Sequence, residues 1–410
     1  MTRVGRFAVV LALGAVACGD DAAPGASTTP PPDAPLVCEP GSAADGDRCR
    51  PAGFEECPDG AGPDGARCGV VAGACAPGTV AFFGQAACTS VGPGECPSGF
   101  ERDPSGFGCA PVVTSDACTG ATRPRLGATA CVSVGDCDAP FPPAAATYFV
   151  DDSYTAGQID ATHFATIQAA VAAAPSGATI AIEEGAYSGT VTLPKAVTLV
   201  GRCAAKVTLS GEGAATPGLE VAKKIKTSFR GLTVKDFEVG VSAGAGADAT
   251  LDGLVVEANR RLGILAADAG TRVLAKGVVV RGTLPDASGR FGHGAASGFE
   301  AEMTIEDSAI TDSSEIGAGA QRDGRITVRR SVVSGVVQRA SNDAYGWGIG
   351  TQTGGHATVV ESAIEHAFAG GVVAAEAGTA VRLERSSVRD VRKGPTTGGG
   401  TVAAAALALG

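Results

Sequence analysis

The chain has 410 residues and a formal net charge of −11, and 44% of its residues are hydrophobic. That apolar content excludes a wholly disordered protein, and the acidic charge argues against nucleic acid and against electrostatic attraction to anionic membranes. Only 5% of the residues are aromatic, whereas 60 are glycine. Small apolar side chains in this proportion favour many thin, tightly stacked layers over one bulky core.

The N-terminus has the pattern of an export signal. Arg3 and Arg6 precede an apolar run over 7–17, which is too short to span a bilayer. The segment AVAC, which ends at Cys18, resembles the lipobox of bacterial lipoproteins, although Ala stands three residues before the cysteine where Leu is usual. The resemblance implies lipidation at Cys18, with ordinary secretion as the alternative. The Pro-rich segment 19–37 cannot bury a core and is predicted to be a tether.

Cysteines dominate the next segment. Eleven of the twelve that follow Cys18 lie between residues 38 and 137, and they open units of about twenty residues. Each unit contains one pair with regular spacing: Cys38 and Cys49, Cys57 and Cys68, Cys75 and Cys88, Cys96 and Cys109, and Cys118 and Cys131. The spacing favours a disulfide within each unit and one from Cys137 to Cys203, although sequence alone does not fix connectivity. Because this segment has no Cys-x-x-Cys motif and no histidine, we expect disulfides and no metal.

The pattern changes at residue 147. Apolar residues at helical spacing predict an amphipathic helix over 164–174. Short β-branched runs then predict strands at 179–182, 191–193, 197–200 and 207–209. The block TIQAAVAAAPSGATIAIEEGAY resembles the N-terminal part of the right-handed parallel β-helices of the pectate lyase superfamily, in which a helix covers the open end of the first coil. This resemblance covers 147–410 and implies an all-β solenoid.

Seven six-residue frames recur along the rest of the chain, 22 to 31 residues apart: FRGLTV (229), LDGLVV (251), AKGVVV (275), IEDSAI (305), VRRSVV (328), VVESAI (359) and LERSSV (383). The first position of each frame is apolar, as is the last, which predicts two core ladders in a solenoid that buries itself by stacking. The second position alternates in charge from Arg230 through Asp252, Lys276 and Glu306 to Arg329. Opposite charges on neighbouring coils, about 4.8 Å apart, favour this register.

Longer loops follow the frames of the third, fifth and seventh coils, and we expect them to project from one edge. The first holds Gly292-His293-Gly294, a motif of pectin-cleaving glycosidases in the same superfamily, where an Asp-Asp pair and an Arg-x-Lys accompany it. Here the Asp-Asp pairs lie at 20–21 and 151–152, and no residue separates Arg392 from Lys393. Since a glycosidase needs two carboxylates at the scissile bond, we assign no catalytic, cofactor-binding or metal-binding residue.

The same loops carry candidate ligand-binding residues. Aromatic faces beside amides and charges suit sugar rings, which have apolar faces and hydroxyl edges. The alternative is that Phe291 and Trp347 pack back over the solenoid, and that the polar residues are merely solvated. The candidates are Arg290, Phe291, His293, Arg339, Asn342, Asp343, Tyr345 and Trp347. His163, His356 and His366 are expected to be local polar residues.

These features predict four segments: a lipoprotein signal peptide at 1–18, a tether at 19–37, disulfide-rich repeats at 38–146 and a β-helix at 147–410. We expect a lipid-anchored protein of the bacterial envelope, in the outer membrane, which binds or displays a polysaccharide or a surface protein without catalysis or cofactor. Two alternatives stay open, a carbohydrate-active enzyme (a polysaccharide lyase or glycosidase) and a structural stalk. The final TVAAAALALG predicts a strand without a polar cap, so we expect either that a partner covers it or, as we favour, that the chain is a fragment.

Overall fold

The computed structural model describes residues 37–38, 42–51, 61–64, 67–70, 75–82, 87–221, 223–392 and 404–409. The predicted signal peptide, Cys18 and nearly all of the tether lie outside these residues. Contacts divide the chain into one unit of residues 1–75 and 80–89 and a second unit of residues 76–79 and 90–410. The predicted boundary at residue 146 stays a prediction, while contacts group residues 90–146 with the β-helix.

The cysteine repeats form short hairpins closed by disulfides. The antiparallel pairs are β1 (Ser42–Asp45) with β2 (Arg48–Pro51), β3 (Ala61–Asp64) with β4 (Arg67–Val70), β7 (Phe100–Arg102) with β8 (Cys109–Pro111), and β9 (Thr122–Arg123) with β10 (Val132–Ser133). Two further strands are β5 (Thr79–Val80) and β6 (Thr89–Ser90). The predicted pairing is confirmed for Cys38–Cys49, Cys75–Cys88, Cys96–Cys109, Cys118–Cys131 and Cys137–Cys203. Cys57 lies outside the described residues.

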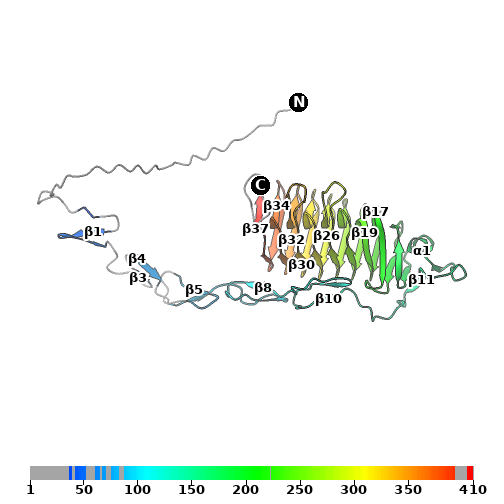
Figure 1. Ribbon diagram of the computed structural model, residues 1–410, viewed down its shortest axis with the longest axis horizontal. Helices are drawn as coiled ribbons and strands as arrows, with labels where there is room; N and C mark the ends of the chain where they lie inside the picture. Colours follow the sequence, from blue (N-terminus) through cyan, green and yellow to red (C-terminus); the bar gives the residue numbers. More distant parts are fainter. Residues whose placement is uncertain are drawn as a thin grey trace, which may run out of the picture. The chain divides into compact units, whose positions relative to one another are not determined.

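The rest of the second unit is a right-handed parallel β-helix, as predicted, whose strands stack side by side in Figure 1. Its 11-stranded sheet has the order β12 (His163–Phe164), β11 (Ala146–Val150), β13 (Thr179–Ile182), β16 (Thr198–Gly201), β18 (Lys226–Arg230), β20 (Asp248–Asp252), β23 (Arg272–Lys276), β26 (Glu302–Glu306), β29 (Arg325–Arg329), β32 (His356–Val360) and β35 (Ala380–Glu384). We call the outer side of this sheet the first face.

The 16-stranded sheet supplies two further faces. The second face carries the short strands β21 (Val255–Glu257), β24 (Val279–Arg281), β27 (Ala309–Thr311), β30 (Val332–Ser334), β33 (Ala363–Glu365) and β36 (Ser387–Arg389). The third face carries β22 (Leu262–Ala267), β25 (His293–Gly298), β28 (Ile316–Gln321), β31 (Trp347–Gln352), β34 (Gly370–Ala375) and β37 (Ala404–Leu409). β19 (Thr233–Ala243) pairs with both β21 and β22 and joins these faces, and β17 (Val207–Val221) pairs with β14 (Gly185–Ser188), β15 (Val191–Leu193) and β19.

Both predicted ladders are confirmed in register and are buried in the core, except in the last coil, where Leu383 is 39% exposed. Phe229, Leu251, Ala275, Ile305, Val328, Val359 and Leu383 pair in one continuous register. Val234, Val256, Val280, Ile310, Val333, Ile364 and Val388 do the same. The third frame position turns the chain between the first and second faces, and it has positive φ in each frame, with Gly231 at 66° and Arg330 at 45°.

The capping helix is shorter than predicted. α1 spans Ile167–Ala173, because the Thr166 hydroxyl accepts a hydrogen bond from the Ala169 N–H and fixes the N-cap in an extended conformation. Phe164, expected in the helix, lies in β12 and pairs with Val150. The helix buries Ile167 and Val171 against the first coil, as the resemblance implied. No helix in the described part of the chain is long and apolar enough to cross a membrane.

Strand predictions in the first coils were close, with one large difference. β13 and β15 match the predicted ranges, β16 is shifted by one residue, and β14 was not predicted. β17 continues to Val221, well beyond the predicted end at residue 209. Its pairing with β19 shifts register between Ser210 and Ala214 and again before Pro217, so an irregular strand continues where none was predicted.

Residues 110–143, which we call the strap, run along the second face; Figure 1 draws them in cyan beside the β-helix. Near the start of the strap, β8 contacts β36, and at its far end Cys137 is bonded to Cys203. Between these points Val134 and Ala121 join an apolar cluster with Val255, Val279 and Ala309, whose outward side chains are at most 1% exposed. The strap therefore gives the second face an apolar layer of its own.

One arginine fixes the middle of the strap. The Arg281 guanidinium donates hydrogen bonds to the backbone carbonyls of Cys118, at 3.2 Å, and Thr122, at 3.1 Å, and also to that of Gly120. Its charge is balanced by Glu257 on the neighbouring coil, at 2.7 Å. Because a fork of N–H donors meets several carbonyls at once, this residue sets the position of the strap along the coils.

Candidate functional site

Small residues occupy the central outward positions of the third face. Ala296, Gly319 and Gly350 lie on successive strands, in register and facing outward, and we call them the small-residue strip. On one side of the strip, Gln321 pairs in register with Gln352. On the other side, His293, Ile316 and Trp347 form the opposite border. The hollow over the strip has a volume of only about 10 Å³, so it is a shallow, open track.

Trp347 lies across the glycines of this face. A Cβ atom at Gly350 would lie 2.8 Å from the Trp347 Cε3, and one at Gly370 would lie 3.5 Å from its Cδ1. The indole ring is therefore held close to the sheet because neither position carries a side chain. Tyr345 packs edge-on against it, with ring centroids 5.0 Å apart, and the Arg339 guanidinium lies 4.7 Å from the Tyr345 ring. Both aromatic side chains remain partly exposed.

A buried carboxylate, Glu315, ties the two loops together. The Arg339 Nε donates to it at 2.5 Å, the Phe291 backbone N–H at 2.7 Å, and the His293 Nε2 lies 3.4 Å away. The Glu315 side chain is 2% exposed, and the side chains of His293 and Arg339 are each 12% exposed. The Glu315 backbone carbonyl also accepts hydrogen bonds from Gly346 and Trp347. One residue thus positions both predicted loops.

The ionisation of Glu315 follows from these contacts. Burial alone would raise its pKa, but the hydrogen bonds from His293 and Arg339, together with their positive charge, outweigh burial and hold the pKa below its ordinary value. A general acid needs a raised pKa and access to the substrate. Glu315 has neither property, so its geometry is that of a positioning residue.

The eight predicted residues fall into three groups. The Phe291 backbone N–H and the side chains of His293 and Arg339 converge on Glu315, and Tyr345 and Trp347 form the partly exposed aromatic pair. The other three stand apart in their loops: Arg290, Asn342 and Asp343, whose contacts are with their own loop. The third predicted loop, 392–400, lies almost wholly outside the described residues.

Sequence reasoning missed Gln321, Gln352 and Glu315. The two glutamines had a signal, because the segments GAGAQ (317–321) and GIGTQ (348–352) align and end in the same residue. Glu315 had none, since it is one of 43 acidic residues and its role depends on how two loops converge in space.

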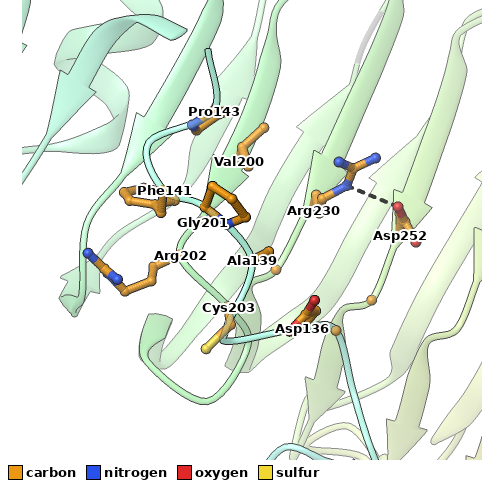
Figure 2. Close-up of a pocket in the computed structure, with 14 residues that line it drawn as sticks. Asp136, Ala139, Phe141, Pro143, Val200, Gly201, Arg202, Cys203, Arg230 and Asp252 are labelled. Atoms are coloured by element: carbon orange, nitrogen blue, oxygen red, sulfur yellow. Dashed lines mark hydrogen bonds and ion pairs between the residues drawn. The ribbon is translucent and has the colours of Figure 1, made fainter. Parts of the chain in front are cut away.

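Figure 2 shows another hollow, of about 360 Å³, between the strap and the first coils. Its charged side chains are already bound to other groups. Arg230 Nε donates to Asp252 at 3.0 Å, whereas Arg202 pairs with Glu183 and lies 5.0 Å from the Phe141 ring. Within the described residues, His, Cys, Asp and Glu side chains form no group that could hold a metal ion. The small-residue strip is therefore the better candidate for ligand binding.

Comparison with known proteins finds likeness only among solved structures. No family model and no curated protein matches the chain. Pectate lyase Pel9A is 12% identical with a TM-score of 0.46, covering 59% of this chain and 78% of the lyase. Pectin methylesterase PemA from Erwinia chrysanthemi is 12% identical with a TM-score of 0.32, covering 65% and 89%, and Escherichia coli ybhc is 12% identical with a TM-score of 0.37, covering 57% and 76%. These likenesses are confined to architecture, so function has to be inferred from the chain's own residues.

Proposed function

We propose that the chain is a non-enzymatic binding module whose third face holds an extended glycan along the small-residue strip. The observation that carries this proposal is the partly exposed Trp347–Tyr345 pair beside the Ala296, Gly319 and Gly350 floor. An aromatic ring held against a flat floor offers an apolar surface to the apolar face of a sugar. A track this shallow suits an extended chain better than a small molecule, which needs a concave pocket.

The glutamine border supplies the polar half of the interaction. Gln321 and Gln352 occupy the same register position on neighbouring strands, so their side chains start about 4.8 Å apart. Each amide carries both donors and an acceptor, the combination that sugar hydroxyls require. A glycan that runs along the coil axis would thus meet two amides, on neighbouring coils, on one side and the Trp347 ring on the other.

The carboxylates near the aromatic pair fit a binding site better than they fit a catalytic site. Acid and base catalysis at a glycosidic bond needs two carboxyl groups that face the substrate. Glu315 is linked to the aromatic pair through Arg339, whose guanidinium lies 4.7 Å from the Tyr345 ring, and His293 and Arg339 already engage it. Its function in this proposal is to keep the two loops in place, so that the ring of Trp347 stays over the strip.

Retention on a polysaccharide array, scored also for cleavage, tests the proposal. Trp347→Ala and Tyr345→Ala are each expected to weaken retention at least about ten-fold, or about 1.4 kcal/mol, because they remove an anchoring aromatic ring. Phe299→Ala is the matched control, since Phe299 is 46% exposed and contacts Arg322 outside the strip. Equal retention by all three variants and the unchanged chain would exclude the strip, and cleavage products would favour the enzyme alternative.

We also propose that the module is anchored to the bacterial outer membrane through a lipid on Cys18. The support is sequence alone: Arg3 and Arg6, the apolar run over 7–17 and the AVAC segment. Mass spectrometry of the N-terminal peptide from membranes tests this directly. We expect a diacylated or triacylated Cys18, and a Cys18→Ser chain released from the membrane fraction; an unmodified cysteine would contradict the anchor.

A further inference from the structure

The first face of the β-helix carries its charges in stripes. Each of five successive strands begins and ends with outward residues of one sign: Lys226 and Arg230 on β18, Asp248 and Asp252 on β20, Arg272 and Lys276 on β23, Glu302 and Glu306 on β26, and Arg325 and Arg329 on β29. These residues pair in register from strand to strand. Positive and negative rows therefore alternate along the coil axis, each row one coil wide.

The ion pairs within the face leave most of this charge in contact with solvent. Arg230 lies 3.0 Å from Asp252, Arg272 lies 3.2 Å from Glu302, and Lys226 lies 3.9 Å from Asp248. The side chains of Lys226, Arg272 and Arg230 are nevertheless 81%, 67% and 63% exposed. Exposed pairs of this kind contribute only about 0–1 kcal/mol each to stability. The same charges remain able to interact with an opposing surface.

From β18 to β32 the centre of the face is flat and uncharged, whereas on β35 Arg382 occupies the central column. Between the two charged columns runs a column of short side chains, Ser228, Thr250, Leu274, Thr304, Thr327 and Thr358. Leu274, in the middle, is 36% exposed. Over these six strands the surface has charge only at its two borders and can approach a second flat surface closely, because no charged side chain stands between the charged columns.

We propose that this face binds the same face of a second copy of the chain, with the two coil axes antiparallel. A two-fold axis along the coils would place each strand opposite its own copy and bring like charges together. A two-fold axis across the coils reverses their order, so that the charges become complementary when β23 lies opposite β20 or β26. Like charges would meet in the parallel arrangement. They would also meet in an antiparallel one in which a strand lies opposite its own copy or opposite a strand two coils away, so these arrangements are excluded.

The area of the face sets the strength of this contact. Six strands about 4.8 Å apart and about 16 Å long cover on the order of 500 Å² on each copy. Stable protein interfaces bury about 800 Å² on each partner, so a weak, reversible dimer is expected. Because exposed charges hold it together, salt will dissociate it as the screening length falls from about 8 Å at 0.15 M to about 3 Å at 1 M.

Sedimentation equilibrium on the full chain tests the association. We expect a dimer that weakens at least about ten-fold between about 0.05 M and 0.5 M salt. Arg272→Gln with Lys276→Gln should weaken it by a similar factor at low salt, because the central positive stripe is lost. Arg125→Gln with Arg290→Gln changes net charge equally at exposed positions outside the face and serves as the control. A monomer at every concentration, or equal effects of both double variants, would overturn the proposal.

Cross-linking tests the geometry independently of the affinity. In the proposed dimer, Ser228 on β18 lies opposite Thr304 on β26 or Thr358 on β32 of the other copy. A bismaleimide linker of about 10 Å, the spacing of packed sheets, should join Ser228→Cys chains to Thr304→Cys or Thr358→Cys chains in mixtures. Ser228→Cys alone should give no linked dimer, and the unchanged chain controls for native thiols. Linkage of Ser228→Cys chains to one another would support the parallel arrangement and refute ours.

Discussion

The first and third faces are built from the same coils, yet they use the outward positions in opposite ways. On the first face, long charged side chains such as Arg272 and Glu302 form ladders and stand largely in solvent. On the third face, Ala296, Gly319 and Gly350 leave the backbone bare, and an aromatic ring lies on it. The comparison shows that the inward residues specify the coil, whereas the outward residues are free to specify an interaction.

The two faces also differ in how their charges are held. Glu302 and its partner Arg272 are 49% and 67% exposed, so water screens them and each can lose its partner at little cost. Glu315, behind the third face, is 2% exposed, and three donors surround it. A buried carboxylate of this kind leaves its partners uncompensated when it is removed. Breaking an ion pair is therefore expected to cost little stability on the first face and much more behind the third face.

The largest effect is expected from Glu315→Ala. This substitution leaves the Arg339 guanidinium and the Phe291 N–H without their acceptor, and breaking a buried pair in this way costs about 3–5 kcal/mol. Denaturant unfolding of the chain measures the loss. Hydrogen exchange should place it in the loops 285–292 and 337–346 and leave β20, β23 and β26 protected. Uniform loss of protection across all three faces would show that Glu315 supports the whole solenoid instead.

The stabilisation that Glu315 contributes behind the third face depends on pH. Its pKa in the folded chain is lowered, so its carboxylate stabilises the fold at pH values above the ordinary carboxyl pKa of about 4.3. That stabilisation is lost as the pH falls through the folded pKa. Glu315→Gln removes the titrating group but keeps its shape. The difference in unfolding free energy between the unchanged chain and the variant should therefore shrink as the pH falls below about 5, and a constant difference would contradict this assignment.

The fold could be predicted from the sequence because its core repeats. Residues such as Leu251, Ala275 and Ile305 recur at one frame position, and stacking puts them in contact regardless of loop length. The candidate site was only half predictable. Trp347 and Tyr345 stood out by residue type, whereas the position of Glu315 depends on loops of two different coils meeting in space. The strap was not predictable either, since its contact with Arg281 joins residues about 160 positions apart.

The smallest effect is expected on the first face. Glu302→Gln keeps the size of the side chain and removes its charge from the pair with Arg272, so we expect a loss of about 0–1 kcal/mol in denaturant unfolding. The loss should disappear at about 1 M salt, where exposed charges are screened beyond about 3 Å. Glu315→Gln should keep its cost under the same conditions, because salt does not reach a carboxylate that is 2% exposed. A salt-independent cost for Glu302→Gln would mean that the charged stripes stabilise the folded chain substantially. The first face would then not differ from the third face in how its charges contribute to stability.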